Sequence, residues 1–207
     1  VAKGMPSLKM LPGLSLDLTT KDPDDNMPWD FDIREKRVKV RKILDEENPI
    51  LVIGSPMCTA YSSWQNLNDL RRDPDVIARE RTRALLHLKF CCELYETQRK
   101  SGRYFIHEHP HGAASWKEDC MQDLIGKPGV VEAVADLCQY GLEAPQNNDK
   151  YDHDPIKKLT RFLTNSRCIQ EALSRRCQGR GGACSRPEGG RHLWLEGKAL
   201  TTHAQHY

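Results

Sequence analysis

The sequence predicts an α/β fold with a largely parallel sheet, because short apolar runs alternate along the chain with longer helical patterns. Residues 50–53 are all apolar and are followed by Gly54, a pattern typical of a strand buried on both faces of a parallel sheet. Residues 103–107 predict the next strand. The helical pattern between them, about residues 75–99, completes a strand–helix–strand unit.

The N-terminal part of the chain predicts a short strand and a helix. Residues 14–18 alternate between apolar and polar side chains, so we expect a strand that carries the carboxylate of Asp17 near its end. Apolar residues recur at helical spacing from Ile33 to Glu47, and Pro49 ends that helix.

The C-terminal part gives weaker patterns. Ser115 can cap a helix over about residues 116–124, and residues 130–136 fit either a strand or a helix. Residues 159–164 predict a strand. The tail from Arg175 onward is rich in Gly, Arg, Cys and His and predicts no element.

Composition excludes some classes of protein. The chain has 207 residues, of which 38% are hydrophobic and 29% charged, so it can form a globular core. The formal net charge of +2 does not by itself indicate a nucleic-acid-binding protein, and the local basic clusters also fit solvated helix faces.

No apolar run approaches the ~20 residues that span a bilayer, and no secretory signal is visible. We therefore expect no membrane partner and an intracellular protein, nuclear or cytoplasmic. Cys91 and Cys92 are adjacent in a predicted buried helix and Cys58 follows a strand, which favours free thiols over a disulfide framework. The chain begins at Val1, which is consistent with a fragment.

Cys58 is the first candidate for chemistry. It lies in a polar loop directly after the predicted strand of residues 50–53, where backbone N–H groups and partial exposure favour a reactive thiolate. The alternative is a cysteine that packs under the loop.

Glu108 is the second candidate, because it follows the strand of residues 103–107 and is flanked by two histidines. Function in such sheets lies at the carboxyl ends of the strands, and Asp17, Cys58 and Glu108 all fall just past predicted strand ends. A carboxyl group there can hydrogen-bond a heterocycle or relay a proton, and the alternative is a solvated loop residue.

Two groups of residues could bind a metal, although neither has a specific motif. One is the alternating series His107, His109 and His111. The other comprises Cys168, Cys177, Cys184 and His192, which lack a Cys-x-x-Cys knuckle. We assign no metal ligands on this basis.

Residues 55–62, Ser-Pro-Met-Cys-Thr-Ala-Tyr-Ser, resemble the Pro-Cys loop of cytosine-5 DNA methyltransferases, in the form found in divergent phage and mobile-element members. In that family the cysteine attacks carbon 6 of a flipped-out cytosine, and carbon 5 then accepts the methyl group of S-adenosyl-L-methionine (SAM). The resemblance implies that Cys58 is the nucleophile and that Pro56 borders the cofactor. Met57 and Tyr61 stand where Pro and Phe are usual.

Residues 107–110, His-Glu-His-Pro, resemble the Glu-Asn-Val or Glu-Asn-Pro motif of the same family. The glutamate of that motif holds ring nitrogen 3 of the cytosine, which implies this role for Glu108, with His109 in place of the usual Asn. Residues 138–141 and 158–165 resemble two downstream segments of the divergent members, and Arg161 in the second is implied to assist at the base.

Two upstream acids complete the resemblance: Asp17 resembles the residue that binds the SAM ribose, and Asp30 the one that approaches the adenine. The resemblance therefore implies a Rossmann-like SAM-dependent methyltransferase fold, SAM as cofactor and DNA as substrate, with RNA left open. We place the methyltransferase-like catalytic domain at residues 1–165 and an unassigned Gly/Arg/Cys-rich extension at residues 166–207.

The chain also departs from the family. We find no Gly-containing first strand and loop to hold the methionine part of SAM, so we expect a fold that is incomplete at the N-terminus. Two other interpretations stay open. One is a catalytically inactive nucleic-acid-binding module of a mobile-element polyprotein, in which five arginines contact phosphates: Arg161, Arg167, Arg175, Arg176 and Arg180. The other is a small zinc-stabilised α/β domain.

Overall fold

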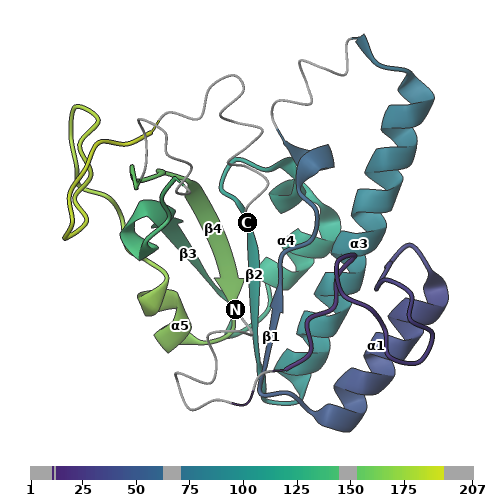
Figure 1. Cartoon of the computed structure of the whole chain (residues 1–207). Coiled ribbons are helices and arrows are strands. Elements are labelled where there is room, and N and C mark those ends of the chain that lie inside the picture. Colours follow the sequence, from purple (N-terminus) through teal and green to yellow (C-terminus); the bar gives the residue numbers. More distant parts are fainter. Residues whose placement is uncertain (1–10, 12, 63–70, 145–152, 194–207) are drawn as a thin grey trace.

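The computed structural model describes residue 11 and residues 13–62, 71–144 and 153–193. These residues contain one four-stranded sheet in the order β1-β2-β4-β3 (Figure 1). Its strands are β1 (Leu51–Gly54), β2 (Tyr104–Pro110), β3 (Val131–Asp136) and β4 (Leu159–Thr164). The predicted α/β class is confirmed, and the segment that fitted either a strand or a helix forms the strand β3.

The prediction of a largely parallel sheet is confirmed only in part, because the sheet is mixed. β1 and β2 are parallel, but β4 runs antiparallel to both β2 and β3. Parallel pairing needs a crossover connection, usually a helix. α3 (Pro74–Lys100) provides it between β1 and β2, whereas the described part of the β3–β4 connection holds only the short helix η5 (Leu137–Tyr140).

Local sequence explains where α3 begins and ends. The Asp73 side chain caps its first turn by accepting a hydrogen bond from the Asp75 amide (2.9 Å), and Pro74 takes the first helical position, where no amide hydrogen is needed. At the other end Gly102 adopts a φ of 69°, which favours glycine. The prediction of one long helix followed by a strand is confirmed.

Helices cover both faces of the sheet (Figure 1). α3 and α4 (Asp119–Ile125) pack together beside β2, and α1 (Arg34–Glu47) packs against α3. α5 (Arg167–Ala172), which the sequence did not predict, packs on β3 and β4. None of the described helices combines the length and the apolar character needed to cross a membrane.

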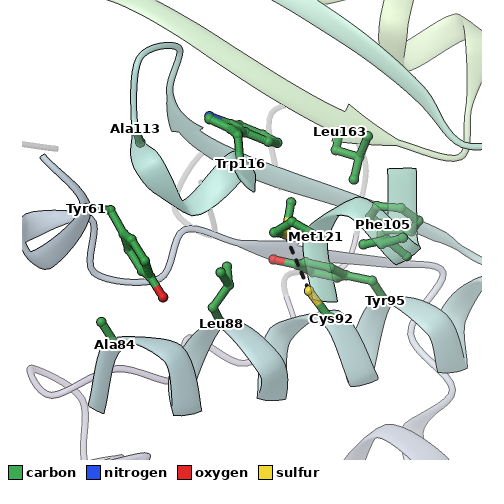
Figure 2. Packing of buried hydrophobic residues seen from close by; sticks show 11 residues of the cluster. Tyr61, Ala84, Leu88, Cys92, Tyr95, Phe105, Ala113, Trp116, Met121 and Leu163 are labelled. Carbon is green, nitrogen blue, oxygen red and sulfur yellow. Dashed lines mark hydrogen bonds between the residues drawn. The ribbon is translucent and has the colours of Figure 1, made fainter. Parts of the chain in front are cut away.

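The main core lies between α3, α4 and the sheet (Figure 2). Tyr95 of α3 is fully buried and stacks on Phe105 of β2, with 4.9 Å between the ring centroids. Leu88 and Met121 fill the space between the two helices. Each such side chain stabilises the fold by about 1.5–3 kcal/mol, so this core fixes the position of β2.

Two predictions about the N-terminal half are wrong. Residues 14–18 form no strand: Leu14 and Leu18 are exposed, and only Leu16 is half-buried against the cluster that contains Trp29. β1 is not buried on both faces, because it is the edge strand of the described sheet and Ile53 remains 41% exposed.

Candidate functional site

Cys58 lies in the loop that follows β1, and the short helix η2 (Thr59–Tyr61) begins directly after it. The Tyr61 amide donates to the Cys58 carbonyl oxygen at 2.9 Å, which closes the turn. The Tyr61 ring is buried in the main core and anchors the loop (Figure 2). As a result Cys58 is half-buried rather than packed away.

His109 of β2 ties this loop to the sheet. Its Nε2 lies 2.7 Å from the Pro56 carbonyl oxygen, and its Nδ1 lies 2.6 Å from the Ser115 hydroxyl. Because a carbonyl only accepts, Nε2 carries the hydrogen and Nδ1 accepts from Ser115. Burial lowers the pKa of His109, which keeps the imidazole neutral in this arrangement. Pro56 is thus held through its backbone.

Glu108 lies within β2 rather than beyond its end, and its side chain leaves the opposite face from that of His109. Its Oε1 lies 3.8 Å from the Lys158 Nζ. The same oxygen is buried and has no hydrogen-bond partner among the described residues. Buried carboxylate oxygens are usually hydrogen-bonded, so this one is suited to a donor from a ligand.

The structure brings Cys58, Glu108 and Lys158 together. Burial raises the pKa of the Cys58 thiol, the positive charge of Lys158 lowers it, and the negative charge of Glu108 raises it. The thiol therefore rests protonated at neutral pH and needs activation. Sequence reasoning assigned no role to Lys158, although Lys158 begins the segment 158–165 that resembles a motif of the family and directly precedes β4.

Arg161 does not join this group. It pairs with His109 in the sheet register and therefore leaves the face opposite to Glu108. Its guanidinium lies 4.4 Å from the centroid of the Trp116 ring and forms an ion pair with Glu132. These contacts give Arg161 a structural role on the α4 side of the sheet.

Asp17, one of the two acids implied for SAM, is exposed and does not follow a strand. Its Oδ1 accepts from the amide and the hydroxyl of Thr19, both at 2.6 Å, and from the Thr20 amide at 3.1 Å. The hydrogen bond from the Thr19 hydroxyl is the largest cause that lowers the pKa of Asp17. This carboxylate is therefore engaged within its own turn.

Asp30, the second of these acids, lies beside the N-terminal half of α3. Its Oδ1 accepts from the Asp32 amide at 2.9 Å and lies 4.0 Å from the Arg83 guanidinium. Asp32 in turn pairs with Arg83 and His87. The two carboxylates and the imidazole of His87 are close enough to hold a cation, but Arg83 already supplies positive charge there.

A hollow of about 540 Å³ separates this part of α3 from the loop of Cys58. Met57, Thr59 and Ala60 line its loop side, and Arg83 and His87 line its helix side. Neither Cys58 nor Glu108 lines this hollow.

The histidine series does not form a metal site among the described residues. The rings of His107 and His109 lie on one face of β2, with centroids 4.8 Å apart, whereas His111 is exposed. His107 Nδ1 lies 3.1 Å from the Tyr95 hydroxyl, and both nitrogens of His109 are engaged. A different set, Cys138, Cys177, Cys184 and His192, does gather its ligand atoms.

Comparisons of this chain with protein-family models, curated proteins and solved structures give no match.

Proposed function

We propose that this chain activates cytosine for cytosine-5 methyl transfer, with Cys58 as the nucleophile that attacks carbon 6 of an extruded base. The observation that carries the proposal is the buried Glu108 Oε1, which has no hydrogen-bond partner among the described residues, beside a half-buried thiol. A cytosine ring offers both an electrophilic carbon and a ring nitrogen for such a pair of groups.

The steps follow from the side chains. The Cys58 thiol passes its proton to the Glu108 carboxylate, and the resulting thiolate forms a bond to carbon 6. The π electrons of the C5–C6 bond move to carbon 5. Glu108 shares a proton with ring nitrogen 3 and so stabilises the added electron pair. Carbon 5 takes up an electrophile and later loses its original proton. The sulfur–carbon bond then breaks, which restores the aromatic base and the thiolate.

Lys158 enters this proposal as the group that offsets the effect of burial on the thiol. Its charge lowers the pKa of Cys58, and its Nζ lies 3.8 Å from the Glu108 carboxylate. Once Glu108 holds a proton that it shares with the base, its negative charge no longer raises the pKa of the thiol. Substrate binding and nucleophile activation are thereby linked.

The resemblance proposes SAM as the methyl donor, which would supply the methyl group for carbon 5. The described residues fit SAM only in part. Asp17 is committed to its own turn, and the hollow near Asp30 is lined by arginines, which suit a cationic sulfonium poorly. We therefore derive no step through SAM and confine the proposal to the activation of the base.

The order of the strands supports the proposal at the level of the fold. A last strand inserted antiparallel between its two predecessors resembles the closing half of the sheet in Rossmann-like SAM-dependent methyltransferases. The described cysteines are all free, in keeping with an intracellular protein, nuclear or cytoplasmic. DNA is the proposed partner, with RNA as the alternative polymer.

The second candidate is a module that binds an extruded base without turnover. The raised pKa of Cys58 and the partial fit to SAM favour it. In this case the Glu108 oxygen receives a hydrogen bond from the base, and no covalent bond forms.

The two candidates are separated by exchange of the cytosine C5 hydrogen with water. Addition of a thiolate to carbon 6 makes C5 exchangeable, so tritium at C5 is released without any methyl donor. We expect release by the wild-type chain and by Cys168→Ala, whose thiol is exposed on α5, and none by Cys58→Ala. DNA and RNA oligonucleotides are compared in parallel.

A second arm adds SAM and a 5-fluorocytosine oligonucleotide, whose fluorine blocks the final elimination. A denaturation-resistant adduct, absent in Cys58→Ala, would extend the proposal to methyl transfer. Tritium release without an adduct would limit it to base activation. Tight binding with neither signal, from a folded protein, would reject catalysis in favour of the binding module.

A further inference from the structure

Four potential metal ligands come together beside the end of the edge strand β3. Cys138 lies in η5, directly after β3, and Cys177, Cys184 and His192 come from the irregular segment that follows α5. Their ligand atoms all lie within 4.8 Å of one another. This set differs from the set that the sequence suggested, because Cys168 is exposed on α5 and Cys138 takes its place.

The distances match a tetrahedral centre. Zinc binds thiolate sulfur at about 2.3 Å and imidazole nitrogen at about 2.0–2.1 Å, which places neighbouring ligand atoms about 3.6–3.8 Å apart. The Cys177 and Cys184 sulfurs are 3.9 Å apart, and the Cys177 sulfur lies 3.5 Å from His192 Nε2. A disulfide needs sulfurs at about 2.05 Å, so the cysteines here are arranged as ligands and not as a bridge.

Burial distinguishes two of these ligands within the C-terminal segment. Among residues 174–193, which form no helix and no strand of the sheet, only Cys184 and His192 are buried. The segment therefore has no apolar core of its own. Its backbone closes on itself through the bonds of Cys184 N to Gly190 O (2.8 Å) and His192 N to Gly182 O (2.7 Å), which turn both side chains inward.

Hydrogen-bond donors surround the sulfurs, as negatively charged thiolates require. The Ser185 amide and hydroxyl each lie 3.5 Å from the Cys177 sulfur. The side-chain nitrogen of Gln139, Nε2, lies 3.5 Å from the Cys184 sulfur and 3.6 Å from the Cys138 sulfur. The Cys177 amide also donates to Asp136 Oδ2 at 2.8 Å, which fixes this ligand beside the end of β3.

We propose that Cys138, Cys177, Cys184 and His192 bind one Zn²⁺ ion in a closed structural site. Three thiolates and one imidazole in a tetrahedral arrangement select zinc over the hard cations that prefer oxygen. Four protein ligands leave no open position for a substrate, so the ion holds structure and does not take part in catalysis.

The site fastens the C-terminal segment to the sheet beside the candidate functional site. The amide of Leu137, the neighbour of Cys138, donates to the Lys158 carbonyl at 3.0 Å. Loss of the ion should therefore loosen both residues 174–193 and the start of β4.

The first test measures the zinc content of the full chain, purified under reducing conditions, by elemental analysis. We expect one zinc per chain in the wild type and in Cys168→Ser, the matched control. Cys184→Ser should bind added Zn²⁺ at least about 100-fold more weakly. Equal loss of zinc in Cys168→Ser, or full retention in Cys184→Ser, would contradict the proposed ligand set.

A second test does not depend on the folding of a variant that lacks a ligand. Co²⁺ alone, added to the metal-free wild type, should give the absorption of a tetrahedral thiolate site. His192→Cys keeps four ligands, so it should still bind Co²⁺ with a spectrum shifted towards four thiolates. A folded wild-type chain that binds neither Zn²⁺ nor Co²⁺, or a native Cys177–Cys184 disulfide found by mass spectrometry, would overturn the proposal.

Discussion

Glu108 and Lys158 act on the thiol of Cys58 in opposite directions. Their side chains approach to 3.8 Å, measured from Oε1 to Nζ, and the carboxylate raises the pKa of the thiol whereas the ammonium lowers it. Burial, the largest effect, also raises it. The reactivity of Cys58 should therefore respond with opposite signs to changes at its two neighbours.

Replacement of Glu108 by Gln separates thiol activation from base recognition. Glu108→Gln removes the charge that opposes thiolate formation, so Cys58 should be alkylated severalfold faster at neutral pH. The same variant cannot take up a proton and share it with ring nitrogen 3, so it should release C5 tritium at least about 10²-fold more slowly. Alkylation is measured on the Cys58 peptide by mass spectrometry, since other cysteines also react. If both rates fell together, Glu108 would be acting through the fold instead.

Loss of the Lys158 charge should have the opposite effect on the thiol. Lys158→Met keeps a long apolar chain but removes the charge that lowers the Cys58 pKa, so alkylation should slow at neutral pH and recover at higher pH. Lys158→Arg keeps the charge and is the matched control. A pH profile of alkylation that is the same in the wild type and in Lys158→Met would exclude this role for Lys158.

His109 is expected to position the loop of Cys58 without touching the base. His109→Leu leaves the Pro56 carbonyl and the Ser115 hydroxyl without their partner and should destabilise the protein by about 1–3 kcal/mol. His109→Asn, the residue that the resemblance would place here, retains a donor and should lose less. Thermal unfolding measures the stability of each variant, and tritium release measures whether the loop still places Cys58 correctly against the base. Equal stability and equal release for Leu and Asn would argue against this role.

Local patterns predicted much of the fold. β1, α3 and β2 follow from apolar runs, a helical period and clear end signals, all of which lie within short stretches of sequence. The insertion of β4 between β2 and β3 depends on pairing between distant segments, which no local pattern encodes. Residues 14–18 show the same limit, since an alternating pattern forms a strand only where a partner is present.

The candidate site also contains residues that local sequence predicts and residues that only long-range pairing brings in. Cys58 and Glu108 could be expected together because each lies near the carboxyl end of one of two parallel neighbouring strands. Lys158 reaches them only through the antiparallel pairing of β4. Cys138 is likewise far in sequence from Cys177, so its spacing carried no metal signal.

The protein should lose stability on mild acidification. Burial lowers the pKa of His107 well below 6.5 and also lowers that of His109. Below about pH 6.5 the unfolded chain therefore binds protons that the folded chain does not, and each histidine removes up to about 1.4 kcal/mol per pH unit until its folded pKa is reached. Carboxylates, whose ordinary pKa values lie near 4, contribute little in this window.

Denaturant unfolding at about pH 7.5 and about pH 5.5 measures this effect. His107→Leu should show a smaller difference between the two conditions than the wild type. His111→Leu should not, because His111 is exposed. A difference that is unchanged in His107→Leu would assign the acid sensitivity to other groups.

Gly54, which closes β1, should be intolerant of any side chain because of Tyr95. A β-carbon at this position would lie 1.9 Å from the Tyr95 Oη and 2.9 Å from its Cζ. Tyr95 cannot move away, since it is fully buried and stacked on Phe105. Gly54→Ala should therefore destabilise the protein by about 1–3 kcal/mol. Gly112→Ala, where a β-carbon meets nothing within 4 Å, should be close to neutral.

Tyr95→Phe tests the cause of this intolerance, because it removes the hydroxyl that the alanine would strike. The single change costs the contact of that hydroxyl with His107 Nδ1, which is 3.1 Å away. In a double-mutant cycle Gly54→Ala should cost less in the Tyr95→Phe background than in the wild type. Equal costs in both backgrounds would mean that Tyr95 does not limit this position. A reduced cost would show that the glycine that starts the Cys58 loop is needed for close packing against α3.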